Sequence, residues 1–334
     1  MNEVLVIKAS PESLRAQVSI AASPALKRFD KAKPVYFKIN GNCDKYYPGS
    51  NTSPWFLDAV LCAFQDAGFR DIVIIEGDLF EFKVEKMLRE TYLENVIGNK
   101  KAKYLNYENE ERDEDACPRF LNDAQIVNLP VMHTHGFAKI SVAVKNLWGF
   151  LPVTRRKLHR QMYEILMKLY AKYRMFNLVD GTVGMVGDST RTGLPKRLDL
   201  VLSGWDALSV DSACASIMGF RREEIPHLNL AASKGLIKDF TINGDFTERN
   251  LPKHNFNYSD SSMRKLTRWL EAMESPNAIN TITSEILKLG PIDFAYQSAR
   301  TGYNNMVFKS KQEKIYSGDW KDYERCVQYI KFKH

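Results

Sequence analysis

The stretch QIVNLPVMHTHGFAKISVAVKNLWG, residues 125–149, decides how the rest of the chain is interpreted. It begins with Gln125–Pro130, an apolar run of strand length. Gly136 then permits a turn, and the pattern over roughly Lys139–Leu147 predicts a helix that stops at Gly149. A buried strand followed by a turn and a helix is the repeating unit of layered α/β proteins.

The same alternation continues on both sides of this stretch. Further strands are expected at Val4–Lys8, Pro34–Asn40, Asp71–Glu76, Ala102–Tyr107, Phe176–Val179 and Leu198–Leu202. Further helices are expected at Pro11–Phe29, Pro54–Ala67, Phe82–Asn95, His159–Tyr173, Asp206–Met218 and Glu223–Lys234. Because strands alternate with helices, the sequence predicts a layered α/β fold with a mainly parallel sheet and helices on both faces.

The composition changes after about Asn243, where Asn, Ser, Thr, Lys and Tyr become frequent and strand-like runs become rare. We therefore expect residues 1–242 to form the α/β core. Residues 243–334 are expected to form a mostly helical extension that packs on this core instead of folding independently.

Charge, cysteines and apolar runs exclude several classes of protein. The formal net charge of +7 favours anionic partners, which include carboxylates and phosphates as well as nucleic acid. The five cysteines are scattered without a C-x-x-C pair, which argues against a disulfide framework, a zinc ribbon and an intrinsic iron–sulfur cluster. No apolar run is long enough to span a bilayer, and Met1–Lys8 lacks signal-peptide features, so we expect a cytoplasmic protein without a membrane anchor.

Several standard catalytic motifs are missing from the chain. It contains no G-x-x-x-x-G-K-[ST], no G-x-G-x-x-G after a strand, no H-E-x-x-H and no G-x-S-x-G. P-loop kinases, simple dinucleotide-dependent dehydrogenases, zincins and α/β hydrolases are therefore disfavoured.

The densest group of chemically capable residues follows the strand at Gln125–Pro130. His133 and His135 have i, i+2 spacing, which points both rings to one side of an extended chain and makes them candidate ligands of a divalent metal. The alternative is that one ring caps backbone groups while the other is solvated. Lys145 lies among apolar residues, so its ammonium is either partly desolvated and reactive or extended towards solvent.

Other candidates also follow expected strands, at the edge where open α/β sheets bind ligands. Asp180 can bind a metal, orient a histidine or take a proton. The Gly-rich stretch Gly181–Gly193 is interpreted as a flexible cover, an amide cradle for an anion or an ordinary surface loop. The candidate catalytic residues are His135, Lys145 and Asp180, expected in one cavity, and the candidate substrate-binding residues are Lys38, Asn40, Asn146, His159, Arg160 and Arg191.

Two flanking features have simple structural explanations. The basic run from Arg155 to Arg160 is either a solvated face or an anion-binding rim. Asp206, at the start of an expected helix, is best explained as an N-cap.

These motifs, in this order, resemble domain-of-unknown-function family 362 over roughly Pro34–Gly235. The matching elements are Lys38-Ile-Asn40, His133-Thr-His135-Gly with Val-Lys145-Asn146-Leu-Trp-Gly149, Leu158-His159-Arg160, Val179-Asp180-Gly181, Thr190-Arg-Thr-Gly193, Ser209-Val-Asp211 and Ile225-Pro-His227. Many members of that family carry a ferredoxin-like cysteine domain, which this sequence lacks. Val186 stands where the family often has a glutamate. A looser likeness, in shape only, is to the nickel-pincer lactate racemase group.

Three functions follow as hypotheses. The first is an enzyme that acts on a small anionic substrate at the carboxyl ends of the strands, with a bound metal as an option. The second is a non-catalytic protein that binds a cofactor or metabolite. The third is nucleic-acid binding, for which only the charge and the basic run from Arg155 to Arg160 speak. The sequence leaves the substrate, the reaction class and the oligomeric state open.

Overall fold

The computed structural model of the protein describes residues 2–79, 81–187, 191–256 and 290–332. For residues 156, 157 and 290–301 it describes the backbone only.

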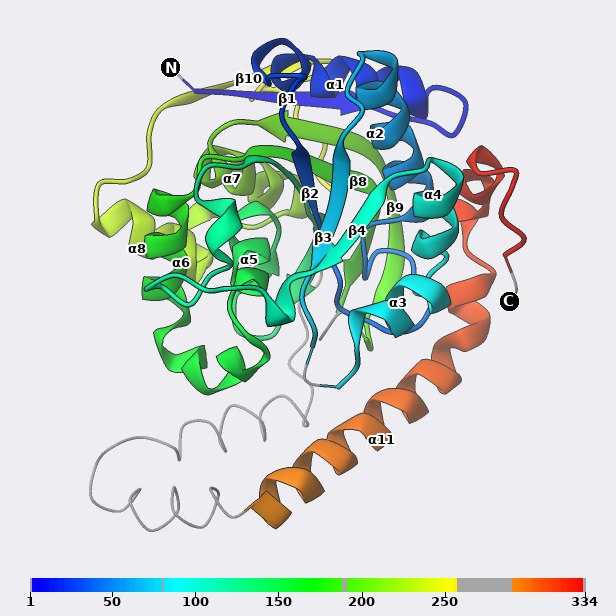
Figure 1. The fold of residues 1–334 in the computed structure, drawn as a ribbon, viewed down its shortest axis with the longest axis vertical. Coiled ribbons are helices and arrows are strands. Elements are labelled where there is room, and N and C mark those ends of the chain that lie inside the picture. The colour runs from blue at the N-terminus through cyan, green and yellow to red at the C-terminus, as the bar shows by residue number, and fades with distance from the viewer. Residues whose placement is uncertain (1, 80, 188–190, 257–289, 333–334) are drawn as a thin grey trace.

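A ten-stranded sheet runs through the centre of the molecule, in the order β10-β1-β9-β8-β5-β2-β3-β4, with β6 paired to β8 and β7 paired to β6 (Figure 1). The strands are β1 (Asn2–Lys8), β2 (Val35–Ile39), β3 (Ile72–Glu76), β4 (Lys103–Asn106), β5 (Gln125–Leu129), β6 (Val131–His135), β7 (Lys139–Ser141), β8 (Phe176–Val186), β9 (Leu194–Gly204) and β10 (Phe240–Gly244). Strands β4, β3, β2, β5 and β8 pair with one another in parallel, and the antiparallel pairs are β1–β9, β6–β7 and β8–β9. The predicted α/β class with a mainly parallel sheet is confirmed.

Helices cover the sheet on two sides, and each side has its own apolar core (Figure 1). The α-helices are α1 (Leu14–Arg28), α2 (Pro54–Asp66), α3 (Val84–Glu90), α4 (Leu93–Asn99), α5 (Ala143–Asn146), α6 (Met162–Lys172), α7 (Ala207–Met218), α8 (Pro226–Ser233) and α11 (Gly290–Tyr316). The 3-10 helices are η1 (Tyr107–Asn109), η2 (Arg119–Leu121), η3 (Leu147–Phe150), η4 (Val153–Gln161), η5 (Arg222–Glu224) and η6 (Asp319–Cys326). Helices α1, α2 and α4 pack on one core, and α5 to α8 pack on the other.

Local sequence signals explain where several helices begin and end. Pro54 begins α2, a position where its missing N–H costs nothing. Asp206 caps α7 by accepting a hydrogen bond from the Ser209 N–H at 3.0 Å, so the predicted N-cap is confirmed. Gly219 ends α7 in the left-handed conformation, with φ of 88°.

Two expected segments have different structures. The helix predicted at Lys139–Leu147 is wrong in its first part, because Lys139–Ser141 forms β7 against β6 and only Ala143–Asn146 is α-helical. The Gly-rich stretch Gly181–Gly193 begins as strand, since β8 continues to Val186 and pairs with β9. A Cβ at Gly181 would lie 2.8 Å from the Leu200 carbonyl oxygen, so this glycine permits close strand packing instead of a loop.

The C-terminal region is mostly helical, as predicted, but it begins differently from the expectation. Strand β10 pairs in parallel with β1 and crosses the expected boundary at residues 242 and 243. Further on, α11 leads to η6, whose Trp320 is buried beside Trp55 of α2 with ring centroids 6.4 Å apart. That residues 243–334 do not fold alone stays a prediction. No helix in the described ranges is both long and apolar enough to cross a membrane.

Candidate functional site

A cluster of cationic side chains lies where β2 and β3 end and α5 begins. Lys38 lies near the end of strand β2, Lys145 lies in helix α5, and Arg155 lies in the 3-10 helix η4. Their charges act on one another, since those of Arg155 and Lys38 both depress the pKa of Lys145. We call these three residues the cationic cluster.

Within the cluster, Lys38 is neutralised by a buried carboxylate. Its Nζ lies 2.8 Å from both carboxylate oxygens of Glu76 and 2.6 Å from the Ile39 carbonyl oxygen, so all three ammonium donors have acceptors. The Tyr107 hydroxyl and the Gly41 N–H donate to the same carboxylate. Burial lowers the pKa of Lys38, and Glu76 opposes that shift. Lys38, predicted to bind substrate, therefore has its hydrogen-bonding capacity occupied within the fold.

Lys145, unlike Lys38, has no carboxylate partner among the described residues. Its half-buried ammonium makes no hydrogen bond or ion pair with any described residue, and its clearest contact is the Trp148 ring, whose centroid lies 5.7 Å from Nζ. Desolvation is the main cause that lowers the pKa of Lys145 to about 7, and the charges of Arg155 and Lys38 add to it. At neutral pH a large part of this side chain is the free amine.

Arg155 is the second cation of the cluster that lacks a carboxylate partner in the described part of the chain. Its guanidinium donates to the carbonyl oxygens of Asp78 and Leu151, which hold it in place without cancelling its charge. The predicted binder Arg160 is exposed at the other end of η4. Arg155 was in the basic run noted in the sequence, but nothing there distinguished it from its neighbours.

The two candidate metal ligands have different environments. His133 is 1% exposed, with Nδ1 3.2 Å from its neighbour's carbonyl oxygen and Nε2 3.3 Å from the Asn42 amide nitrogen. A proton on Nδ1 therefore satisfies both contacts. Burial lowers the pKa of His133 to about 4, and the charge of Lys145 contributes. Its imidazole is neutral at neutral pH.

His135 plays the capping role that the sequence left open for one of the two histidines. Its Nδ1 accepts hydrogen bonds from the N–H groups of Phe137 at 3.1 Å and Ala138 at 3.2 Å. The lone pair on that nitrogen is thus occupied. The described ranges contain no group of three or more His, Cys, Asp or Glu side chains arranged to hold a metal ion.

A series of aromatic contacts connects the predicted histidines with Lys145. The ring of His159 lies 5.3 Å from Phe137 and 5.7 Å from Trp148, centroid to centroid. Phe137 in turn lies 6.1 Å from His135. The structure therefore brings His135, His159 and Lys145 into one neighbourhood, with Trp148 and Phe137 between them.

Helix α5, which carries Lys145, is anchored at its first turn by a buried carboxylate. Asp211 of α7 accepts hydrogen bonds from the N–H groups of Ala143 at 2.7 Å and Val144 at 3.3 Å. His227 of α8 lies 2.8 Å from the same carboxylate, and both side chains have no exposed surface. Asp211 and His227 belonged to the sequence motifs, yet no role could be assigned to them from the sequence.

A second anchor lies beneath α5. Asn146 donates to the Asn128 side-chain oxygen at 2.7 Å, and Asn128 donates to Asn177 at 2.9 Å and to the Ala143 carbonyl oxygen at 3.1 Å. Asn146 is 6% exposed, so its amide is engaged with the sheet. This amide network was missed by sequence analysis, which interpreted β5 only as an apolar strand.

Asp180 and Asn40 are both buried and make hydrogen bonds within the fold. Asp180 points into the core of α1 and α2, as Phe176 and Leu178 of the same strand do. Its two oxygens accept hydrogen bonds from Ser53 and Thr182, each hydroxyl at 2.6 Å. The Asn40 side chain accepts from the N–H of Val131 at 3.3 Å. Among the described residues no hydrogen bond or ion pair joins Asp180 to Lys145, and the single cavity expected for these residues stays a prediction.

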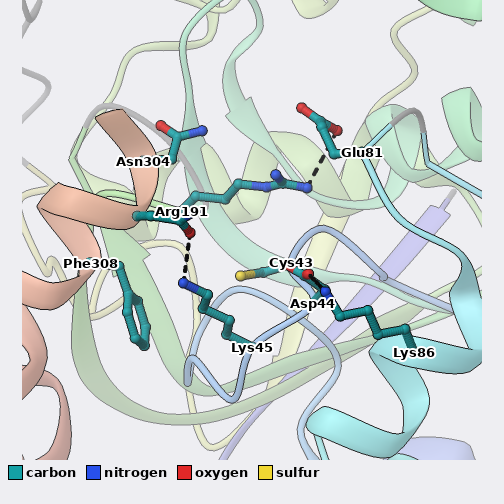
Figure 2. Close-up of a pocket in the computed structure, with 9 residues that line it drawn as sticks. Cys43, Asp44, Lys45, Glu81, Lys86, Arg191, Asn304 and Phe308 are labelled. Carbon is teal, nitrogen blue, oxygen red and sulfur yellow. Dashed lines mark hydrogen bonds and ion pairs between the residues drawn. The ribbon is translucent and has the colours of Figure 1, made fainter. Parts of the chain in front are cut away.

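Arg191 lies in a separate pocket of about 230 Å³, shown in Figure 2. Its guanidinium is 3.4 Å from Glu81, and Lys86 pairs with Asp44 at 2.6 Å. Lys45 donates to the side chain of Asn305, so α11 closes one side of this pocket. Lys145 does not line it, and the pocket's charges are largely paired internally.

Comparisons with known proteins give one match. No curated protein matches the chain, and no solved structure matches it. The sequence pattern of one family, the domain of unknown function DUF362, matches residues 35–216, which include α5, the cationic cluster and both histidines. This range is more than half of the 334 residues. The chain therefore belongs to the DUF362 family.

Proposed function

We propose that the protein is an enzyme that acts on a small anionic substrate, carboxylate- or phosphate-bearing, bound at Lys145 and Arg155. The single observation that carries this proposal is the Lys145 ammonium, which lies half-buried beside Arg155 and Lys38 without any hydrogen-bond acceptor among the described residues. An uncompensated charge that is partly removed from water is costly, and a bound anion removes that cost.

The balance of positive and negative charges in the cationic cluster favours an anionic ligand. Glu76 neutralises Lys38, and the remaining positive charges belong to Lys145 and Arg155. Fixed positive groups in a partly desolvated site attract anions more strongly than the same groups in water. The half-buried Arg155 is held by two backbone carbonyls, so its guanidinium is preorganised for a carboxylate or phosphate.

Two titratable groups with shifted pKa values favour catalysis over simple binding. Lys145, with a pKa lowered to about 7, can give or take a proton near neutral pH. His133, with a pKa lowered to about 4 by burial and by the charge of Lys145, is a neutral imidazole. A binding protein has no need of a lysine in its neutral form, because the neutral amine holds an anion poorly. Nucleic-acid binding has less support, since the only exposed large aromatic side chain of the described residues, Tyr329, bonds to Asp58.

The test is stabilisation by anions. Thermal unfolding of the wild type, K145M and K321M is measured with and without inorganic phosphate, pyrophosphate and citrate at constant ionic strength. Lys321 is an exposed lysine distant from α5 in the sequence, so K321M is the matched control. We expect at least one anion to stabilise the wild type and K321M and to lose its effect in K145M. Equal stabilisation of all three proteins, or of none, would overturn the proposal.

A further inference from the structure

The cationic cluster contains two lysines with opposite environments. Lys38 donates to three acceptors and is neutralised by Glu76, which is how a buried lysine is held when its charge serves the fold. Lys145 has no acceptor among the described residues, lies against the Trp148 ring and experiences the charges of two other cations. A lysine that only binds anions needs its proton. The surroundings of Lys145 instead favour loss of the proton, which makes the nitrogen a nucleophile.

We propose that the substrate carries a carbonyl group beside its anionic group, and that Lys145 attacks this carbonyl carbon to form an imine. This inference rests on the proposed function, because Arg155 must hold the anionic group. The substrate class is therefore a small oxo acid or a phosphorylated aldehyde or ketone. Deprotonated Lys145 is the attacking form, and a substantial part of it is deprotonated near pH 7.

The step balances without an oxidant or a metal. The lone pair of the Lys145 nitrogen forms the C–N bond while the C=O π electrons move to oxygen. That oxygen takes up a proton, the nitrogen loses one, and the resulting carbinolamine releases water as the C=N bond forms. These protons exchange with solvent water, because His133, whose pKa is lowered to about 4, is too weak a base to hold a proton near pH 7. The positive charges of Lys38 and Arg155 keep the free amine available.

The experiment traps the imine by reduction. The full-length protein is incubated at pH 7 with glyoxylate and sodium cyanoborohydride, and the modified lysines are located by peptide mass spectrometry. We expect Lys145 to be modified at least about tenfold faster than any other lysine, because its pKa is lowered and Arg155 holds the anionic reagent beside it. Phosphate should suppress the modification, K145M should abolish it, and K321M should leave it unchanged.

A neutral reagent separates the role of Arg155 from simple amine reactivity. Glycolaldehyde replaces glyoxylate, and R155M is compared with the wild type. R155M should slow trapping of glyoxylate at Lys145 much more than trapping of glycolaldehyde, since only glyoxylate carries the carboxylate that Arg155 holds. Equal slowing of both reagents would overturn the assignment of the anionic group to Arg155.

The outcomes distinguish this inference from the function on which it rests. If anions stabilise the protein through Lys145 but trapping spreads over surface lysines, the imine proposal is overturned and the anionic-substrate proposal stands. If neither anion stabilisation nor selective trapping is found, both are overturned. Selective trapping that phosphate suppresses supports both.

Discussion

At the scale of single residues, the sequence predicts which side chains matter better than it predicts how they are used. Lys38 and Lys145 were both identified, yet one is neutralised by Glu76 and the other is not. Glu76 ends an apolar strand 38 residues from Lys38, and only the parallel pairing of β2 with β3 brings it within reach. The sequence alone does not show that Lys38 and Glu76 form an ion pair. The contrast between the two lysines is therefore a result of the fold.

His133 gives a prediction about acid stability. Its pKa is lowered from 6.5 to about 4 in the folded protein, so between these pH values the unfolded chain binds a proton that the folded chain does not. Stability is therefore lost as pH falls from 6.5 towards 4, by up to about 3 kcal/mol at this one residue. H133Q removes the titrating group. We expect the difference in unfolding free energy between pH 7 and pH 4, from urea titrations, to be smaller in H133Q, and an unchanged difference would show that His133 is not held neutral.

At the scale of elements, the sequence predicts the regular strands and helices and misjudges the short segment that carries the site. The residues that follow Gly136 have apolar positions compatible with helix or strand, and the strand wins at Lys139–Ser141 because β6 offers a partner. Helix α5 is only four residues long, too short to be stable on its own. Asp211 accepts hydrogen bonds from its first turn, and His227 contacts the Asp211 carboxylate. These anchors come from α7 and α8, so the local pattern does not reveal them.

The anchor at α5 can be tested directly. D211N replaces a carboxylate oxygen with an amide N–H that faces the backbone donors of α5 and His227. We expect the unfolding free energy to fall by about 2–4 kcal/mol, as for a broken buried network. The pKa of Lys145, measured by pH-dependent acylation, should also rise towards its ordinary value, because α5 no longer holds the ammonium in its desolvated position. S216A on the same helix is the control. A loss of stability with an unchanged Lys145 pKa would mean that Asp211 does not position the lysine.

At the scale of the whole molecule, the mainly parallel sheet follows from the alternation of strands and helices, whereas the role of the C-terminus does not. A composition rich in polar residues suggested an extension after residue 242, but β10 adds to the sheet beside β1 and η6 completes the core around α2. Single aromatic residues far from any apolar run, such as Trp320 and Tyr323, make these contacts. Hydrophobic periodicity, which is judged over a window of residues, does not identify single buried aromatic residues of this kind.

This arrangement predicts that the C-terminal segment is part of the cooperative core. W320A should lower the unfolding free energy by about 3–5 kcal/mol, because it removes a buried indole that stacks on Trp55. K321A, at the exposed neighbouring position, should change it by less than about 0.5 kcal/mol. Both variants should unfold in one transition in urea. A W320A protein as stable as the wild type, or one with two separate transitions, would show that this segment lies outside the core.

The measurement that tests the central claim most directly is the pKa of Lys145. The rate of its acylation, followed by peptide mass spectrometry from pH 5 to pH 11, reports the fraction of free amine, with Lys321 as an exposed reference. We predict a midpoint near pH 7 that moves upward when phosphate is bound, because an anion stabilises the ammonium form. A midpoint near the ordinary value of 10.5 that phosphate does not move would contradict the existence of an uncompensated lysine at this site.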